Sequence, residues 1–170
     1  DIEHPKGGVF GLTKHLSTRY PKRVYNSPLA EATIAGVASG LTMQGWLPVF
    51  ELQFIDFVGP AFNQIMNQIA TLRWRTAGKQ PCPIVLLAPC GGYVAGGGAW
   101  HSQTNESIFC HMPGLRVMML ATPREAANAL LHAATGEDPV LILLPKNQFF
   151  RPQPNVVEVN LYDGKASILQ

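Results

Sequence analysis

The sequence predicts an α/β domain built around a mostly parallel sheet. Four apolar runs are predicted to be strands: 47–52, 84–87, 115–120 and 140–144. The second and fourth are continuous apolar stretches, which is typical of strands buried on both faces. Helical patterns at 60–74 and 122–132 separate these runs. Strands that alternate with helices indicate parallel pairing through crossover connections.

The length of 170 residues indicates one domain with room for a sizeable core. Residues 1–23 are polar and punctuated by Gly and Pro, and we read them as an entry segment with a short helix near 12–17. The α/β domain is expected over 24–151 and opens with a short strand at 24–25. Residues 152–170 are expected to be a linker towards an absent carboxyl-terminal domain. Because the chain begins at Asp1 without an initiator Met, we expect a piece of a longer protein.

The composition bears on whether the chain contacts other proteins, nucleic acid or a membrane. Charged residues make up only 14% of the chain, against about a quarter in typical domains, which suggests surface reserved for partner chains. The longest basic cluster is Arg73-Trp74-Arg75, read as a solvated helix end, so no nucleic-acid partner is expected. No apolar run is long enough to span a membrane. Cys82, Cys90 and Cys110 lack metal-ligand spacing and indicate core packing in a reducing compartment.

Glu31 is the only charged residue between Val24 and Phe50. Ser27 as the N-cap and Pro28 at the first position predict a helix over 28–43. An acid buried on such an apolar helix would have its pKa raised strongly. The alternative is a surface glutamate favoured by the helix dipole. The residues alone leave both interpretations open.

The same helix carries small residues that would let another helix approach closely. Gly36 and Gly40 lie four positions apart, beside Ala32 and Ser39. A helix that is apolar all round must be covered on all sides. We therefore predict homodimerisation through helix 28–43.

Two segments are expected at the carboxyl edge of the sheet, where ligands bind in open α/β folds. Phe54 and Phe57 follow the first strand and are either core residues or a stacking surface for a planar heterocycle. A glycine-rich loop at 89–98 does not match the phosphate-binding patterns and ends near His101. That histidine is either a proton shuttle or a structural imidazole. The amides Asn63, Gln64, Asn67 and Gln68 on the helix predicted at 60–74 are expected to be buried and to have a structural role.

Six segments, taken in order, resemble one family: 7–13, 26–31, 51–57, 60–65, 100–103 and 113–117. Together they resemble the pyrimidine-binding domain of thiamine diphosphate-dependent 2-oxoacid dehydrogenases, the beta-subunit part of the pyruvate and branched-chain enzymes. The resemblance covers about residues 7–151 and implies the transketolase-like fold, a three-layer α/β sandwich.

The resemblance also implies roles for individual residues. Glu31 matches the glutamate that hydrogen-bonds a ring nitrogen of the aminopyrimidine and favours the imino tautomer that forms the ylid. Leu29 lies where the family packs an aliphatic side chain against the cofactor. Phe57 matches the aromatic residue that stacks on the pyrimidine. His101 matches the active-site histidine implicated in acyl transfer to a lipoyl group. Glu31 and His101 are the expected catalytic residues.

The function implied is oxidative decarboxylation of a 2-oxoacid with acyl transfer to lipoamide. The family's GDG…N motif for Mg²⁺ and diphosphate has no match here, so those groups are expected to be held by another domain or an alpha subunit. The fragment alone is expected to be inactive. A lipoyl-bearing acyltransferase is the expected partner, in the cytoplasm or, for a eukaryotic protein, the mitochondrial matrix. Alternatives are another transketolase-like enzyme or a non-catalytic assembly module.

Two departures from the family pattern matter. Leu87 stands two residues before Pro89, where the family often has an Arg. The stretch 135–138 replaces the polar groups of the family's monovalent-cation site, so its ligands are not assigned here.

Overall fold

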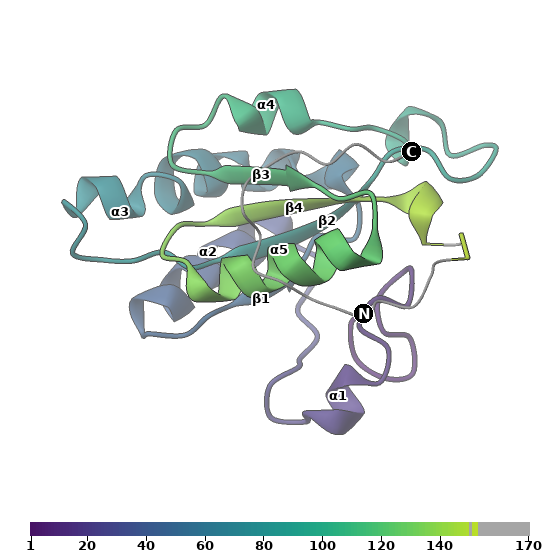
Figure 1. Ribbon diagram of the computed structural model, residues 1–170, viewed down its shortest axis with the longest axis horizontal. Helices are drawn as coiled ribbons and strands as arrows, with labels where there is room; N and C mark the ends of the chain where they lie inside the picture. Colours follow the sequence, from purple (N-terminus) through teal and green to yellow (C-terminus); the bar gives the residue numbers. More distant parts are fainter. Residues whose placement is uncertain (150, 153–170) are drawn as a thin grey trace.

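The computed structural model describes residues 1–149, 151 and 152. Its sheet contains four strands in the order β1-β2-β4-β3, and every neighbouring pair is parallel. The strands are β1 (Val49–Glu51), β2 (Val85–Cys90), β3 (Arg116–Met119) and β4 (Val140–Pro145). The four predicted strands and their parallel pairing are therefore confirmed. All four strands end at the same edge of the sheet (Figure 1).

The sheet has a core on each face, which makes a three-layer sandwich as predicted. Leu86 of β2 pairs with Leu141 of β4, and both pack towards α2 (Glu31–Met43). Val85 pairs with Val140, and both pack towards α5 (Pro123–Thr135). Neighbouring residues of a strand point to opposite faces, so each strand supplies both cores. Figure 1 shows α5 in front of the sheet with α2 and α3 behind it.

The helix predicted at 60–74 is a succession of shorter helical types. A 3₁₀ turn at Gly59–Ala61 leads into a π-helix at Gln64–Ile69 and then α3 at Leu72–Arg75. The wider winding is marked by the Ala70 amide, which donates to the Ile65 carbonyl at 2.9 Å. Asn67 Nδ2 donates to Asn63 Oδ1 at 2.9 Å, but both residues are exposed, so the expectation that these two amides are buried is wrong.

The predicted start of α2 is wrong by three residues. The helix begins at Glu31 with Ala30 as its N-cap, not at Pro28 with Ser27 as the cap. The Ala30 amide donates to the Pro28 carbonyl at 2.8 Å, which forms a tight turn ahead of the helix. The Ser27 hydroxyl donates to the same carbonyl at 3.2 Å and caps nothing. Glu31 is therefore the first residue of the helix.

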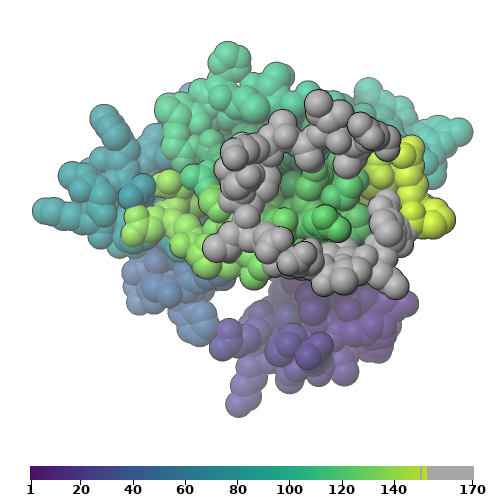
Figure 2. All heavy atoms as spheres, viewed as in Figure 1, coloured from purple at the N-terminus to yellow at the C-terminus, as the bar shows by residue number. Residues whose placement is uncertain are grey.

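The entry segment folds back on itself, with α1 at Leu16–Arg19. Residues 24–25 do not form the predicted strand. Instead, the next residue, Asn26, exchanges two hydrogen bonds with Glu3. The Asn26 backbone amide donates to Glu3 Oε1 at 2.7 Å, and the Glu3 backbone amide donates to Asn26 Oδ1 at 3.0 Å. In Figure 2 the purple amino-terminal residues form the lower part of the molecule. Residues 153–170 of the predicted linker lie outside the described residues.

The cysteines are divided between core and surface. Cys82 and Cys90 are buried, which confirms core packing for those two, whereas Cys110 is exposed. Burial raises the pKa of the Cys82 and Cys90 thiols to about 11, so both stay protonated at neutral pH. Within the described part of the chain, no helix is long and apolar enough to cross a membrane.

Candidate functional site

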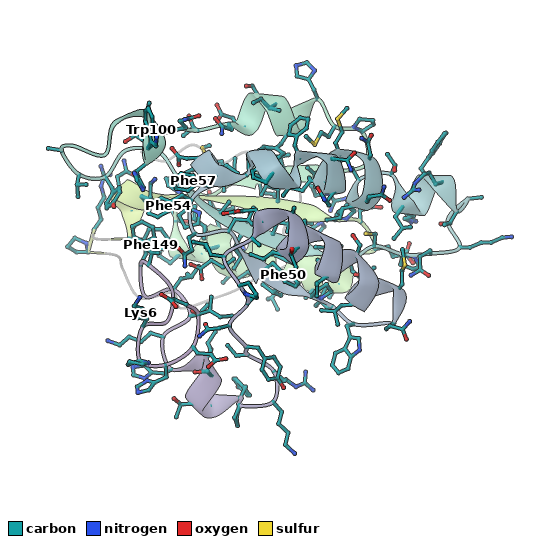
Figure 3. All side chains as sticks on the ribbon, turned by 180° about the vertical axis from the view of Figure 1, so that it is seen from behind. Lys6, Phe50, Phe54, Phe57, Trp100 and Phe149 are labelled. Carbon is teal, nitrogen blue, oxygen red and sulfur yellow. The ribbon has the colours of Figure 1, made fainter. Side chains whose placement is uncertain are left out.

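Aromatic side chains gather beyond the carboxyl ends of the strands. β1 leads into a 3₁₀ turn at Ile55–Phe57, and β4 leads into another at Lys146–Gln148. Figure 3 labels three phenylalanines that lie close together at this end of the sheet: Phe54, Phe57 and Phe149. The turns that follow β1 and β4 therefore lie together at this edge.

The glycine-rich loop brings His101 to this cluster. Gly91, Gly96 and Gly98 have φ values of 77°, 87° and 57°, a region that favours glycine. A 3₁₀ turn at Gly98–Trp100 follows, with His101 as its C-cap. His101 therefore lies at the end of the loop, as predicted. The half-buried imidazole lies edge-on to Phe54 at 4.8 Å and to Phe57 at 5.4 Å between ring centroids.

Phe57 lies at the rim of the aromatic cluster, whereas Phe54 lies inside it. Phe54 is half-buried and packs edge-on against Phe10, whose ring stacks on Phe149 at 5.2 Å. Phe57 remains 39% exposed. An exposed ring beside an imidazole is suited to contact a planar heterocycle, so the interpretation of Phe57 as a core residue is not supported.

Glu31 and Leu29 come from a different element, the amino-terminal end of α2. Glu31 is half-buried and so less shielded than the sequence predicted. It shares a helix face with the buried Ile34, Ala35 and Ala38, but it occupies the first turn, where the helix leaves the core. Its carboxylate has no hydrogen-bond or ion-pair partner among residues 1–149, 151 and 152. Leu29 is 72% exposed.

The carboxylate of Glu51, the last residue of β1, is also buried at this edge. Both of its carboxylate oxygens are buried, and neither has a hydrogen-bond partner in the described structure. Burial raises the pKa of this carboxyl above its usual value of 4.5. The entry segment covers it so closely that a Cβ on Gly8 would lie 2.7 Å from Oε1. Sequence reasoning missed this burial, because the covering residue lies 43 positions away in the chain.

Replacing Glu51 by Gln should stabilise the protein at neutral pH. The raised pKa means that the folded state holds the proton more tightly than the unfolded state, so stability falls as pH rises above 4.5 and through the raised value. The stability difference between Glu51→Gln and the wild type should therefore grow with pH and then level off. Urea unfolding between about pH 5 and 8 measures it. A Glu51→Gln variant that is less stable across that range would contradict the assignment.

Sequence reasoning also missed the buried charges Lys146 and Asp56, which flank His101. Lys146 is fully buried, and its Nζ lies 3.9 Å from Asp56 Oδ2. The one available signal was the position of Lys146, directly after the buried run that ends at Pro145.

The structure shows what surrounds Leu87 and the stretch 135–138, the two places where the sequence departs from the family pattern. Leu87 is buried in the core beneath α5, together with Val85 and Ile142. In the stretch 135–138, both acidic side chains pair with Arg73, at 2.7 Å for Glu137 and 3.0 Å for Asp138. Among the residues that the structure describes, no group of three or more His, Cys, Asp or Glu side chains could hold a metal ion.

Several curated proteins named as dehydrogenase beta subunits are similar to this chain. The chain is 42% identical over 168 residues to a mitochondrial 2-oxoisovalerate dehydrogenase subunit beta of Dictyostelium discoideum, covering 96% of this chain and 45% of that protein. It is 45% identical over 145 residues to a 2-oxoisovalerate dehydrogenase subunit beta of Bacillus subtilis, covering 85% and 44%. A pyruvate dehydrogenase E1 component subunit beta of Leifsonia xyli is 39% identical over 147 residues, covering 86% and 43%. The chain thus spans less than half the length of these curated relatives.

The fold and the family follow from two further comparisons. A solved structure described as a split gene transketolase, inactive beta4 tetramer, matches with a TM-score of 0.73 and 23% identity, over 97% of this chain and 49% of that one. This similarity confirms the predicted transketolase-like fold. The model of the transketolase pyrimidine binding domain matches residues 1–151. The chain therefore belongs to the transketolase pyrimidine binding domain family.

Proposed function

We propose that this chain supplies the aminopyrimidine half of a thiamine diphosphate site in a 2-oxoacid dehydrogenase. The complete protein would decarboxylate a 2-oxoacid oxidatively and transfer the acyl group to lipoamide. The observation that carries the proposal is the contact between the His101 and Phe57 rings at the carboxyl edge of the sheet. The beta-subunit names of relatives at 39–45% identity support the same reaction.

The side chains fit the pyrimidine end of this cofactor. Glu31 offers a carboxylate without a partner in the described structure, on a helix end that is only half shielded from water. Phe57 offers an exposed aromatic ring, and Leu29 an aliphatic side chain that is 72% exposed. These three side chains supply a hydrogen bond, a stacking surface and an apolar contact, which are the interactions that a flat, polar heterocycle requires.

Each residue has a distinct role in the proposed reaction. The Glu31 carboxyl holds a proton at the ring nitrogen of the aminopyrimidine, and Phe57 and Leu29 orient the ring. His101 can donate or accept a proton beside the reacting centre, because a neutral imidazole carries one nitrogen that donates and one that accepts. When bound, thiamine diphosphate supplies the carbanion chemistry that no protein side chain provides.

The other half of the site is assigned to a partner. We propose that a diphosphate-binding domain or alpha subunit holds the diphosphate and Mg²⁺, and that a lipoyl-bearing acyltransferase receives the acyl group. The names of the relatives as beta subunits support a partner of this kind. The proposed compartment is the cytoplasm, or the mitochondrial matrix in a eukaryote.

An assay of the complete protein with its partner chain tests the function. We expect lipoamide-dependent turnover of 2-oxoisovalerate or pyruvate that requires thiamine diphosphate. Ketol transfer between sugar phosphates, without lipoamide reduction, would favour another transketolase-like enzyme. Absence of both activities would favour the non-catalytic assembly module, for which the replacement at Leu87 is the supporting observation.

We also propose that α2 mediates self-association. Gly36, Val37 and Gly40 are exposed on one stretch of a helix that carries no charge after Glu31. The exposed small residues would let a second copy of the helix pack closely. Light scattering at micromolar concentration should give at least the mass of a dimer, and Gly40→Leu should shift the protein towards the monomer. A wild-type monomer would contradict this proposal.

A further inference from the structure

Two fully buried charges lie beneath the loop that carries His101. The Lys146 side chain is 0% exposed and the Asp56 side chain 1% exposed. Taking both charges out of water is costly, and replacing such a pair by well-packed apolar residues often leaves a protein equally stable. Asp56 Oδ2 has no hydrogen-bond partner in the described structure and lies 3.9 Å from Nζ, beyond hydrogen-bond distance. Stability alone is therefore a poor reason for the pair.

The pair holds one short segment from both ends. Lys146 Nζ donates to the backbone carbonyl of His101 at 2.8 Å. Asp56 Oδ1 accepts from the backbone amide of Gln103 at 2.9 Å. Hydrogen bonds to charged groups are stronger than those between neutral groups. The backbone on both sides of Ser102 is thus fixed to residues that follow β1 and β4.

Lys146 also contacts one of the two rings that pack against the imidazole. Lys146 Nζ lies 4.7 Å from the centroid of the Phe54 ring, and that ring lies 4.8 Å from the imidazole of His101. Asp56 directly precedes Phe57, whose ring also contacts the imidazole. Lys146 therefore contacts both the backbone of His101 and the Phe54 ring, and Asp56 is the neighbour in sequence of the second ring.

We infer that Lys146 and Asp56 are positioning residues that set the location of the His101 imidazole for proton transfer during acyl transfer to the lipoyl group. The inference rests on the function proposed above. His101 follows a loop whose glycines allow many conformations, so its location requires an external hold. Burial lowers the pKa of Lys146, and Asp56 offsets part of that effect, which helps keep the ammonium charged as a donor.

The informative variant is Lys146→Met combined with Asp56→Asn, in the complete protein with its partner chain. This double variant leaves no unpaired buried charge. It removes the donor to the His101 carbonyl, and the neutral amide oxygen introduced by Asp56→Asn accepts from the Gln103 amide more weakly than the carboxylate does. We expect kcat with a lipoyl domain to fall about 10–100-fold, since a 1 Å misplacement costs about that much. The rate with an artificial electron acceptor, which needs no acyl transfer, should fall much less.

The informative quantity is the ratio of the rate with a lipoyl domain to the rate with the artificial electron acceptor. Loss of folded protein would lower both rates equally and leave this ratio unchanged, whereas misplacement of His101 would lower it. Lys79→Met removes an exposed lysine and should keep the wild-type ratio. Hydrogen exchange gives a readout that does not need activity: the Gln103 amide should exchange faster in the double variant. An unchanged ratio or an unchanged exchange rate would overturn the positioning role. A wild-type protein without lipoyl-dependent turnover would instead overturn the proposed function, while the exchange rate still decides whether the pair holds the loop.

Discussion

Glu31→Gln should lower the turnover of the complete enzyme by about 100-fold or more while leaving the fold intact. General acid–base groups typically contribute about 10²–10⁴-fold, and the amide of Gln cannot share a proton with the pyrimidine nitrogen as a carboxyl does. Glu31 is the first residue of α2 and has no hydrogen-bond or ion-pair partner among the described residues, so the near-isosteric change to Gln breaks no such interaction. Steady-state kinetics with lipoamide measure the loss.

Two controls make this result specific. Circular dichroism and the unfolding temperature of Glu31→Gln should match those of the wild type. Glu137→Gln changes an exposed acid that pairs with Arg73 on the surface, and it should keep nearly full activity. Wild-type turnover by Glu31→Gln would contradict its proposed role and favour an assembly module.

The second large effect concerns affinity. The 170-residue chain alone should bind thiamine diphosphate at least about 100-fold more weakly than the complete protein does. Each charge-assisted hydrogen bond contributes about 1.5–3 kcal/mol, and 1.4 kcal/mol is a factor of about ten in affinity. Losing even two diphosphate contacts therefore gives this difference. Titration calorimetry of both forms, with Mg²⁺ present, measures it.

Thiamine without its diphosphate provides the matched ligand. If this chain contributes only pyrimidine contacts, then the isolated chain should bind thiamine and thiamine diphosphate about equally weakly. Tight, Mg²⁺-dependent binding of thiamine diphosphate by the isolated chain would refute the division of the site between two units.

The strands could be predicted because their signal is local. The apolar runs that become β2 and β4 are buried on both faces, and their alternate residues supply the two cores. The capping box between Thr122 and Glu125 fixes the start of α5 and is also visible in the sequence. The start of α2 was predicted wrongly, because the turn made by the Pro28 carbonyl competes with the cap that Ser27 would otherwise form.

The aromatic part of the site could be predicted and the buried charges could not. Phe57 and His101 follow strand ends, and the parallel topology places them together. The burial of Glu51 depends on Gly8, and that of Lys146 on the packing of three separate segments. An isolated acid in an apolar stretch suggested that Glu31 is the buried one. Its place in the first helical turn leaves it half-exposed instead.

A crystal structure of the complete protein with thiamine diphosphate and its partner chain tests the central claim most directly, through one distance. We predict that a carboxylate oxygen of Glu31 lies within about 3 Å of a ring nitrogen of the aminopyrimidine, which is hydrogen-bond distance. A Glu31 carboxylate that faces bulk solvent in that complex, with the pyrimidine bound elsewhere, would contradict the proposed site.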